Sequence, residues 1–591
     1  MGLFTASVRM NAHGSFGSSM GFDVSRMSAT RTLGGLNASL RIDLQDAAAR
    51  GTRSRTRKGR TRLAIRIDDI RAALDFPEEE LLSRVLAIIG VSGDEVGHFS
   101  VVRRGLDARG KGDVLRVYAA EVSLRTPGLE ESVCSRVNTA RMVKPAPEPF
   151  PAGNIRTPAV RPVVVGAGPA GLFAAYTLAR FGAPPLLLER GRPVEERSRD
   201  VADFWKTGAL NPESNVQFGE GGAGTFSDGK LTTRIGDPLV SHVIGVFGNF
   251  AGLPGLPADA KPHVGTDRLK GFCRRMREEL ASLGAEVRFG ARVADVEARG
   301  GLVRAIRLAD GEQIPCADLV LAIGHSARDT LRMLLSRGVK MSAKEFAVGF
   351  RVEHPQALID RVQFGRSAGK AGLPPADYRL AARAPSGRGI YSFCMCPGGE
   401  VLAASSVASG MPVNGMSSHG RSSGFANSGI VASVSAEDFG AGDVFAGIEL
   451  QELIEVRAFR KGGGNYGVPA MNLMGFLDGR DLNLSRGKAL APRVARANLS
   501  GILPRKVEED IRFGLREFGK TMRGFLTQEG TLYAVESRTS SPVRMERENH
   551  ESVTMKGLYP VGEGAGHAGG IVSSAVDGIR CALRILEKLS A

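Results

Sequence analysis

Three glycines with a fixed spacing carry the clearest chemistry in this sequence. Gly166, Gly168 and Gly171 follow the apolar run PVVV and fit the pattern G-x-G-x-x-G. The first glycine of such a motif allows a tight turn, the second lets the backbone approach a pyrophosphate, and the third lets a helix pack closely on a strand. A helix beginning at Pro169 and Ala170 would direct free N–H groups and its positive dipole end at the phosphates. These residues predict a dinucleotide site.

The next apolar run, PLLL, ends in Glu189 and Arg190. An acid at the end of the second strand of such a unit binds the hydroxyls of the adenosine ribose. The sequence therefore predicts that Glu189 and Arg190 belong to the same nucleotide site.

A second stretch, NVQFGEGGAGTFSDGKL (215–231), also fits G-x-G-x-x-G by its letters. No long apolar strand precedes it, and the polar run after it cannot begin an apolar helix. We interpret it as a glycine loop whose backbone lies against the same nucleotide, and a mobile surface loop is the alternative. Its predicted contacts are Gly222, Ala223, Gly224, Thr225 and Ser227.

Two later stretches extend the pattern. One is a strand that ends at Gly324, and the other is a strand followed by Gly562, Glu563, a glycine turn and a final helix. Glutathione-reductase-type folds for FAD carry both features in this order. In that architecture Glu563 meets the ribityl-pyrophosphate region, and the start of the last helix faces the flavin. That helix start comprises Gly569, Gly570 and Ile571.

Candidate catalytic residues are two cysteines and two histidines. Cys394 and Cys396 lie in the strand-like run YSFCMC, where residues i and i+2 share a face. They are interpreted as a redox pair or charge-transfer partner of the flavin, or alternatively as buried packing residues. His325 and His567 follow predicted strand ends, and each is a candidate general acid or a hydrogen-bond donor to phosphate or backbone.

Two charged residues beside these motifs, Lys230 and Arg328, also have two possible roles. Lys230 and Arg328 either offset the pyrophosphate charge or lie on the surface. No histidine or acid stands at ligand spacing from the cysteine pair, so we expect no metal site.

These motifs need several domains to position them, and 591 residues are enough for two or three. We expect an α/β protein with a small β-α-β-β unit over 62–145. A nucleotide-binding part over 158–344 follows, then an inserted substrate domain over 345–550 and a closing part of the nucleotide-binding domain over 551–591.

The net charge of +16 is concentrated at the start of the chain. Residues 1–61 are rich in Arg and Ser and end in a basic run, which predicts a disordered tail or a targeting segment. The six scattered cysteines favour a reducing compartment. No apolar run is long enough for a membrane-spanning helix. We expect a cytoplasmic protein, or an organellar one if the tail is a transit peptide.

The chain resembles a large, mostly bacterial family of FAD-dependent dehydrogenases of unassigned substrate, from about residue 62 to the C-terminus. The matching stretches are RRGLDARGKGDVLRVYAAEV (103–122), NVQFGEGGAGTFSDGKL (215–231), KPHVGTDRL (261–269), IYSFCMCPGGEV (390–401), GGGNYGVPA (462–470), TLYAVESRTSSPVR (531–544) and VGEGAGHAGGIVSSAVDGIR (561–580). The resemblance implies a glutathione-reductase-type FAD-binding Rossmann domain, an inserted substrate domain and a small α+β N-terminal domain.

These observations lead to one leading expectation and one alternative. The leading expectation is an oxidoreductase that binds FAD without a covalent link and transfers a hydride between flavin N5 and a small organic substrate. Apart from the units assigned to the FAD fold itself, no further strand–glycine-turn–helix unit follows residue 231, so NAD(P)H is expected only as a transient reductant. The alternative is a flavoprotein that acts on RNA, such as a tRNA-modifying flavoenzyme. It is disfavoured because the basic excess lies in the tail, and nucleic-acid binding is therefore not expected.

Overall fold

A computed structural model describes residues 64–109, 113–143, 150, 158–440, 442–484 and 489–590. The chain divides into two units, Met1–Arg60 and Thr61–Ala591, and the described residues all belong to the second. The predicted basic tail and most of the linker at 144–158 lie outside the described residues.

The first part of the second unit is a four-stranded antiparallel sheet in the order β2-β3-β1-β4, with two helices on one face. This β-α-β-β-α-β succession is the split βαβ arrangement of ferredoxin-like folds. Its elements are β1 (Ala64–Ala72), η1 (Glu78–Glu80), α1 (Leu81–Ile89), η2 (Gly93–Glu95), β2 (Val96–Asp107), β3 (Leu115–Leu124), α2 (Leu129–Arg136) and β4 (Ala140–Val143).

The sequence predicted only the first four main elements of this part. The helix α2 was missed because it is short and only Glu130 and Val133 of its residues are buried, which leaves little helical periodicity. The final strand β4 has four residues and no buried position, so it also lacks a strand pattern.

A five-stranded parallel sheet, in the order β26-β11-β5-β6-β7, carries the predicted nucleotide motif. Each strand is short, and four of them are buried throughout, as expected of strands covered on both faces. The strands are β5 (Val163–Val165), β6 (Leu186–Leu188), β7 (Glu286–Arg288), β11 (Leu319–Leu321) and β26 (Leu558–Pro560).

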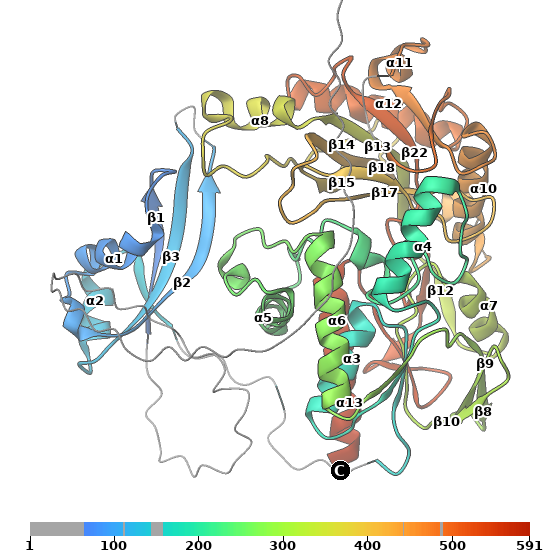
Figure 1. Ribbon diagram of the computed structural model, residues 1–591, viewed down its shortest axis with the longest axis horizontal. Helices are drawn as coiled ribbons and strands as arrows, with labels where there is room; N and C mark the ends of the chain where they lie inside the picture. The colour runs from blue at the N-terminus through green and yellow to red at the C-terminus, as the bar shows by residue number, and fades with distance from the viewer. Residues whose placement is uncertain are drawn as a thin grey trace, which may run out of the picture. The chain divides into compact units, whose positions relative to one another are not determined.

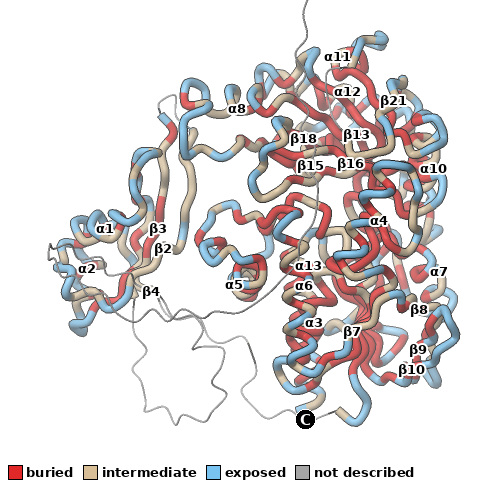
Figure 2. The backbone as a smooth tube through the Cα atoms, viewed as in Figure 1, coloured by how far each residue is buried: buried red, intermediate tan, exposed pale blue. Residues whose placement is uncertain are grey.

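Helices α3 (Pro169–Arg180) and α13 (Ile571–Ser590) lie side by side on this sheet, with α5 (Leu239–Ala251) and α6 (Thr266–Ser282) beside them (Figure 1). Two glycines allow the close packing. A Cβ on Gly171 would lie 1.8 Å from the carbonyl oxygen of Gly166, and one on Gly578 would lie 2.1 Å from that of Ala170. Helix α3 is therefore held against both its own strand turn and the final helix, and it is buried along almost its whole length (Figure 2).

Around this sheet lie α4 (Val194–Thr207), α7 (Arg328–Ser336) and a small antiparallel sheet of β8 (Val293–Arg299), β9 (Leu302–Leu308) and β10 (Gln313–Pro315).

The third part is a seven-stranded sheet in the order β14-β15-β18-β13-β22-β19-β21. Its central strands are buried on both faces, with α8, α10 and α12 packed around them. Its elements are β13 (Phe346–Pro355), α8 (Gln356–Phe364), β14 (Ala381–Arg383), β15 (Gly389–Cys396), β18 (Phe425–Val434), α10 (Ala446–Lys461), β19 (Val468–Asn472), β21 (Val494–Arg496), α12 (Arg505–Thr521) and β22 (Thr531–Glu536).

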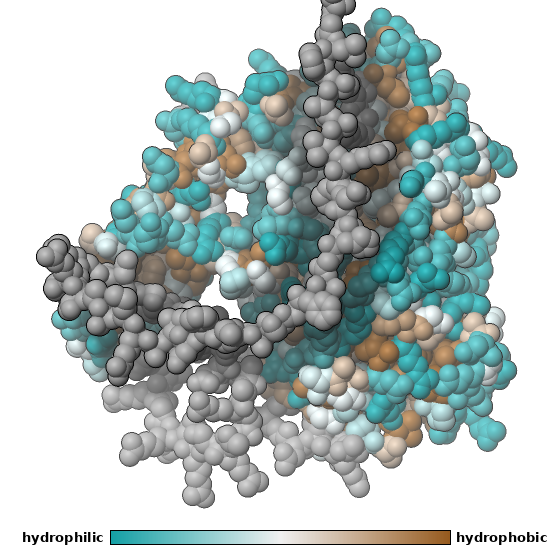
Figure 3. Space-filling model, viewed as in Figure 1, coloured by the Kyte–Doolittle hydropathy of each residue, from teal (hydrophilic) through white to brown (hydrophobic). Residues whose placement is uncertain are grey.

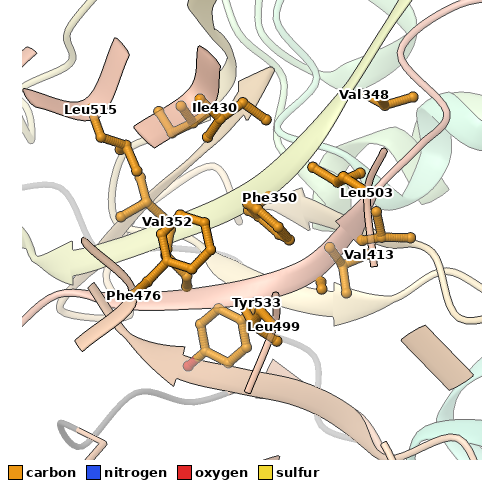
Figure 4. Packing of buried hydrophobic residues seen from close by; sticks show 14 of the residues in the cluster. Val348, Phe350, Val352, Val413, Ile430, Phe476, Leu499, Leu503, Leu515 and Tyr533 are labelled. Atoms are coloured by element: carbon orange, nitrogen blue, oxygen red, sulfur yellow. The ribbon is translucent and has the colours of Figure 1, made fainter. Parts of the chain in front are cut away.

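Figure 4 shows the core of this sheet, in which Phe350 and Val352 of β13 lie among Ile430, Phe476 and Tyr533. The short strands β16 (Glu400–Ala403), β17 (Val413–Met416) and β20 (Ala489–Leu490) form a further small sheet. Strands β12 (Met341–Ala343) and β23 (Val543–Met545) pair with each other. The chain enters the third part after β12 and leaves it before β23. The molecule is thus a mixed α/β protein.

Candidate functional site

A cavity of about 670 Å³ lies at the carboxyl ends of the parallel strands. Ligands of open parallel sheets bind at this edge because the loops there converge. The lining comes from the turns after β5, β6, β11 and β26, from the glycine loop over 222–224, and from the seven-stranded sheet.

The cavity gathers most of the residues predicted to bind the cofactor. Those in its lining are Gly166, Gly168, Pro169, Ala170, Glu189, Arg190, Gly222, Ala223, Gly224, Ser227, Gly324, Gly562, Glu563, Gly569, Gly570 and Ile571. Gly171 and Thr225 are not part of the lining. Gly171 instead serves the packing of α3, and the Thr225 hydroxyl donates to the carbonyl of Glu220 at 3.1 Å.

Helices α3 and α13 both begin at this cavity, with Pro169 and Ile571 as their first residues. Each helix start offers unpaired N–H groups and the positive end of its dipole. A Cβ on Gly168 would come into van der Waals contact with the Cα of Gly222, at 3.8 Å. Two glycine loops thus face each other without side chains between them.

The second glycine loop does not form a Rossmann turn. Its residues Gly222–Phe226 form a short 3-10 turn, and no named strand or α-helix directly precedes or follows it. A buried arginine on α4 holds the loop from behind. Arg197 donates to the carbonyl oxygens of Asn215 at 2.8 Å, Val216 at 2.9 Å and Glu220 at 2.6 Å. No sequence motif marks Arg197, so sequence reasoning missed it.

Glu189 joins the two glycine loops. Its carboxylate accepts hydrogen bonds from the backbone N–H groups of Ala167 at 2.8 Å, Gly191 at 2.9 Å and Gly219 at 3.0 Å. The neighbouring Arg190 pairs with two carboxylates, those of Glu213 and Asp329, and lies over the ring of Phe218 at 4.2 Å. Both side chains therefore fix the cavity wall.

His325 and Glu563 form a pair in the cavity lining. Nδ1 of His325 lies 3.2 Å from Oε1 of Glu563, and the residue is only 8% exposed. Its other ring nitrogen, Nε2, is buried and has no hydrogen-bond partner among the described residues. Buried polar atoms are nearly always paired in native proteins, so an unpaired one in a cavity is a position for a ligand group.

The other predicted histidine lies elsewhere. Nε2 of His567 is 2.8 Å from the carbonyl oxygen of Met545, and the residue is not in the cavity lining. Burial and the charge of Arg547 lower its pKa. Of the two roles predicted for His567, the structure shows the hydrogen bond to the backbone, because the turn after β26 points this ring at β23 and not at the cavity.

Arg328 is likewise not a phosphate partner. It is buried and forms an ion pair with Glu455 of α10 at 3.2 Å. Arg538, which does line the cavity, binds the same carboxylate at 2.9 Å. Although burial opposes it, these two cations lower the pKa of Glu455 to about 2. This buried network between α7, α10 and the end of β22 has no sequence signature.

The prediction that Cys394 and Cys396 point to one face is also wrong. Cys394 lines the cavity, whereas Cys396 is fully buried and outside the lining. The strand is irregular at this point, with a register shift between Phe393 and Cys396 and a positive φ of 43° at Cys394. The bulge breaks the alternation on which the prediction rested.

The wall contributed by the seven-stranded sheet and its neighbours adds Arg379, Phe393, Asn414 and Thr539. Facing residues from the glycine loop include Asp228 and Lys230. Although burial opposes it, the charges of Lys230 and Arg421 lower the pKa of Asp228. This end of the cavity therefore combines an aromatic ring, a thiol and fixed charges.

These features fit FAD. Two helix N-termini and a glycine-lined channel suit its pyrophosphate, and the unpaired Nε2 of His325 offers a hydrogen bond to the bound molecule.

Within the described part of the chain, no group of three or more His, Cys, Asp or Glu side chains is arranged to hold a metal ion. None of the helices in the same part is long and apolar enough to cross a membrane. The face in Figure 3 is largely hydrophilic, with its hydrophobic residues in small groups.

Comparison with known proteins gives matches over most of the chain. A family model described as "FAD-dependent protein, C-terminal domain-like" matches residues 345–539, and a model of a domain of unknown function matches residues 64–123. The chain is 42% identical over 542 residues to an uncharacterized protein of Clostridium beijerinckii, covering 89% of this chain and 99% of that protein.

Solved structures with similarity to the chain are more distant. Tetracycline destructase Tet(51) is 13% identical with a TM-score of 0.30, covering 73% of this chain and 87% of that one. A geranylgeranyl bacteriochlorophyll reductase-like protein from Thermoplasma acidophilum is 14% identical with a TM-score of 0.32, covering 72% and 78%. CtdE in complex with FAD is 11% identical with a TM-score of 0.26, covering 71% and 82%. The alternative of a flavoprotein acting on RNA is not favoured.

Proposed function

We propose that this chain, which belongs to the family of FAD-dependent proteins that includes the Clostridium beijerinckii relative, is an oxidoreductase acting on a small organic substrate. It would hold one FAD without a covalent link, and a hydride would pass between the substrate and flavin N5. The observation that carries the proposal is the glycine-lined cavity onto which two helix N-termini open, closed at one end by the seven-stranded sheet.

The residues of the chain have separate tasks in this proposal. The backbone around Gly168 and Gly222 would receive the pyrophosphate, and Glu189, which joins the two loops, would lie beside the ribose. The start of α13 faces the flavin, where its positive end stabilises negative charge. Bound FAD supplies two-electron redox chemistry at this position.

His325 is the proposed proton-handling residue. A protonated Nδ1 would donate to the Glu563 carboxylate, whose Oε1 is 3.2 Å away, and Nε2 would then carry the lone pair. Nε2 would hydrogen-bond the bound cofactor or substrate and hold or accept one proton there. Phe393 and Asn414, from the other side, would close the substrate end and limit the entry of water.

The electron donor is proposed to be the substrate itself, with NAD(P)H at most a transient reductant. From residue 231 onward, the strand–glycine-turn–helix units of the described residues belong to the one parallel sheet already assigned to FAD, and the sequence there has no further unit of this kind.

Anaerobic mixing of the FAD-loaded protein with NADH or NADPH tests both parts of the proposal, with absorbance of the flavin as the signal. We expect slow bleaching that does not saturate in the micromolar range, and full reoxidation when an electron acceptor is added. Fast, saturable bleaching by one nicotinamide would reveal a nicotinamide site. Failure of every two-electron donor tried, dithionite included, to give a cycle of bleaching and reoxidation would refute an oxidoreductase.

A further inference from the structure

Arg379 brings a positive charge to the cavity wall that the seven-stranded sheet contributes. It stands just before β14, whose pairing with β15 matches Ala381 with Tyr391. Continuing that register sets Arg379 opposite Phe393, which also lines the cavity, and residues opposite each other in an antiparallel pair share a face. Arg379 is exposed and forms no hydrogen bond or ion pair with the other described residues. Its guanidinium is therefore free to bind a ligand beside an aromatic ring.

Lys230 brings a second positive charge from the glycine loop. Its one ion-pair contact among the described residues is with Asp228, at 4.0 Å. That carboxylate is buried and already pairs with Arg421 at 2.8 Å, and it accepts a further hydrogen bond from Ser417. Since Asp228 and Arg421 offset each other, the charge of Lys230 remains largely uncompensated.

The same contacts tie the glycine loop to the wall of the sheet. Ser417 and Arg421, which hold Asp228, follow directly on β17, and β17 contains Asn414 of the cavity lining. Lys230 and Asn414 thus belong to neighbouring segments of one lining. A molecule held between the loop and the sheet would meet side chains from both.

The uncharged polar side chains of this wall leave a donor free and use their acceptors internally. Oδ1 of Asn414 accepts from the backbone N–H of Gly415 at 2.7 Å and from Arg351 at 3.4 Å, while its NH₂ group has no partner among the described residues. The Thr539 hydroxyl donates to the carbonyl oxygen of Ala347 at 2.8 Å and accepts from the N–H of the same residue at 3.1 Å. The side-chain groups left for a ligand here are N–H donors, and two of them are charged.

We propose that the substrate is a small organic acid whose carboxylate is held by Lys230, Arg379 and Asn414, with its apolar part against Phe393. This inference rests on the proposed function, because the substrate would meet FAD in the same cavity. A carboxylate accepts two parallel hydrogen bonds from a guanidinium and offsets its charge, which a neutral group of the same shape cannot do. The pyrophosphate has its own partners on the opposite side, at the glycine turns and helix starts.

Benzoate and benzamide test this proposal because they have nearly the same shape and differ in charge. The FAD-loaded protein is titrated with each at low ionic strength, and the absorbance change of the flavin reports a ligand beside it. We expect a saturable change with benzoate and a Kd for benzamide that is roughly 10-fold higher or more. Added salt should weaken the binding of benzoate and not that of benzamide.

Four variants separate the two cations from the overall charge of the protein. Lys230→Met and Arg379→Gln should each raise the Kd for benzoate roughly 10-fold, since each removes one charged donor. Lys206→Met and Arg383→Gln are the matched controls, because each removes one positive charge from an exposed position outside the cavity lining. Both controls should bind benzoate as the wild type does, and all four variants should keep the wild-type affinity for FAD.

The outcomes separate this inference from the proposed function. Equal affinities of the wild type for benzoate and benzamide, or equal benzoate affinities of the two cavity variants and their controls, would overturn the inference. Weaker FAD binding by Lys230→Met or Arg379→Gln would assign that charge to the cofactor and would also overturn it. A wild type that binds no FAD would refute the proposed function itself, whereas an FAD-loaded protein without preference for benzoate refutes only the acidic substrate.

Discussion

Nδ1 of His325 lies 3.2 Å from Oε1 of Glu563, and this contact joins the loops that follow the adjacent strands β11 and β26. The two residues are more than two hundred positions apart in the sequence, and the parallel pairing of their strands brings them to one edge of the sheet. The residue lines the cavity, and its other ring nitrogen, Nε2, is buried and has no hydrogen-bond partner among the described residues.

Replacement of His325 should therefore weaken FAD binding without unfolding the protein. A hydrogen bond contributes about 0.5–1.5 kcal/mol, so His325→Ala should raise the Kd for FAD by roughly 3- to 10-fold. His567→Ala is the control, because that ring binds the Met545 carbonyl outside the cavity lining. Equal FAD affinities of the two variants in a fluorescence titration would show that His325 does not reach the cofactor.

Gly168→Val should abolish FAD retention in a folded protein. The Cβ itself would only touch the Cα of Gly222, at 3.8 Å, but the added methyl groups would lie between the two glycine loops, at the proposed pyrophosphate position. Gly245→Val in α5 is the matched control, since a Cβ there meets nothing within 4 Å outside its own helix. Full flavin content in purified Gly168→Val protein would count against the cavity as the FAD site.

Two acids of α10 should differ sharply in their effect on stability. Glu455 is buried between Arg328 and Arg538, whereas the side chain of Glu452, which also pairs with Arg328, is 38% exposed. Glu455→Gln should lower the free energy of unfolding by about 3–5 kcal/mol, because it leaves the buried guanidinium of Arg538 without its carboxylate partner. Glu452→Gln should cost less than about 1 kcal/mol. Urea unfolding of both variants measures the difference, and equal losses would contradict the buried network.

His354 should make the protein less stable in mild acid. It is fully buried, with Nε2 2.8 Å from the carbonyl oxygen of Phe525 and Nδ1 unpaired among the described residues, and burial lowers its pKa to about 4. In the unfolded chain the pKa is about 6.5. Protons therefore bind the unfolded state first as the pH falls. The stability that the neutral His354 contributes is complete above pH of about 6.5 and is lost as the pH falls toward about 4.

The magnitude of this pH effect is about 2.5 kcal/mol between pH of about 7 and 4.5, from about 1.4 kcal/mol per unit of pKa difference. His354→Gln removes the titrating group. Between these two pH values, the free energy of unfolding of the variant should therefore fall by about 2.5 kcal/mol less than that of the wild type. Urea unfolding at both pH values checks this. The same loss in variant and wild type would contradict a neutral, buried His354.

Local sequence patterns were sufficient to predict residues at the nucleotide-binding edge of the cavity. They were insufficient to predict the residues of the opposite wall. Gly168 and Glu189 stand in a strand–turn–helix context that has few structural solutions, and the cavity contains both. Arg197 and Glu455 contact residues that only the tertiary fold brings near them, so no spacing could reveal their roles. Cys396 was misjudged because a bulge, invisible in the alternation of apolar residues, rotates one thiol away from the other's face.

The flavin content of the purified protein tests the central claim most directly. The protein, saturated with FAD and freed of excess nucleotide, is denatured, and the nucleotide in the supernatant is identified and counted against the chain. We predict FAD at about one per chain, with no yellow colour on the precipitate, because one FAD without a covalent link is proposed to occupy the cavity. Absence of bound flavin after saturation, or flavin that stays with the precipitated chain, would contradict this account.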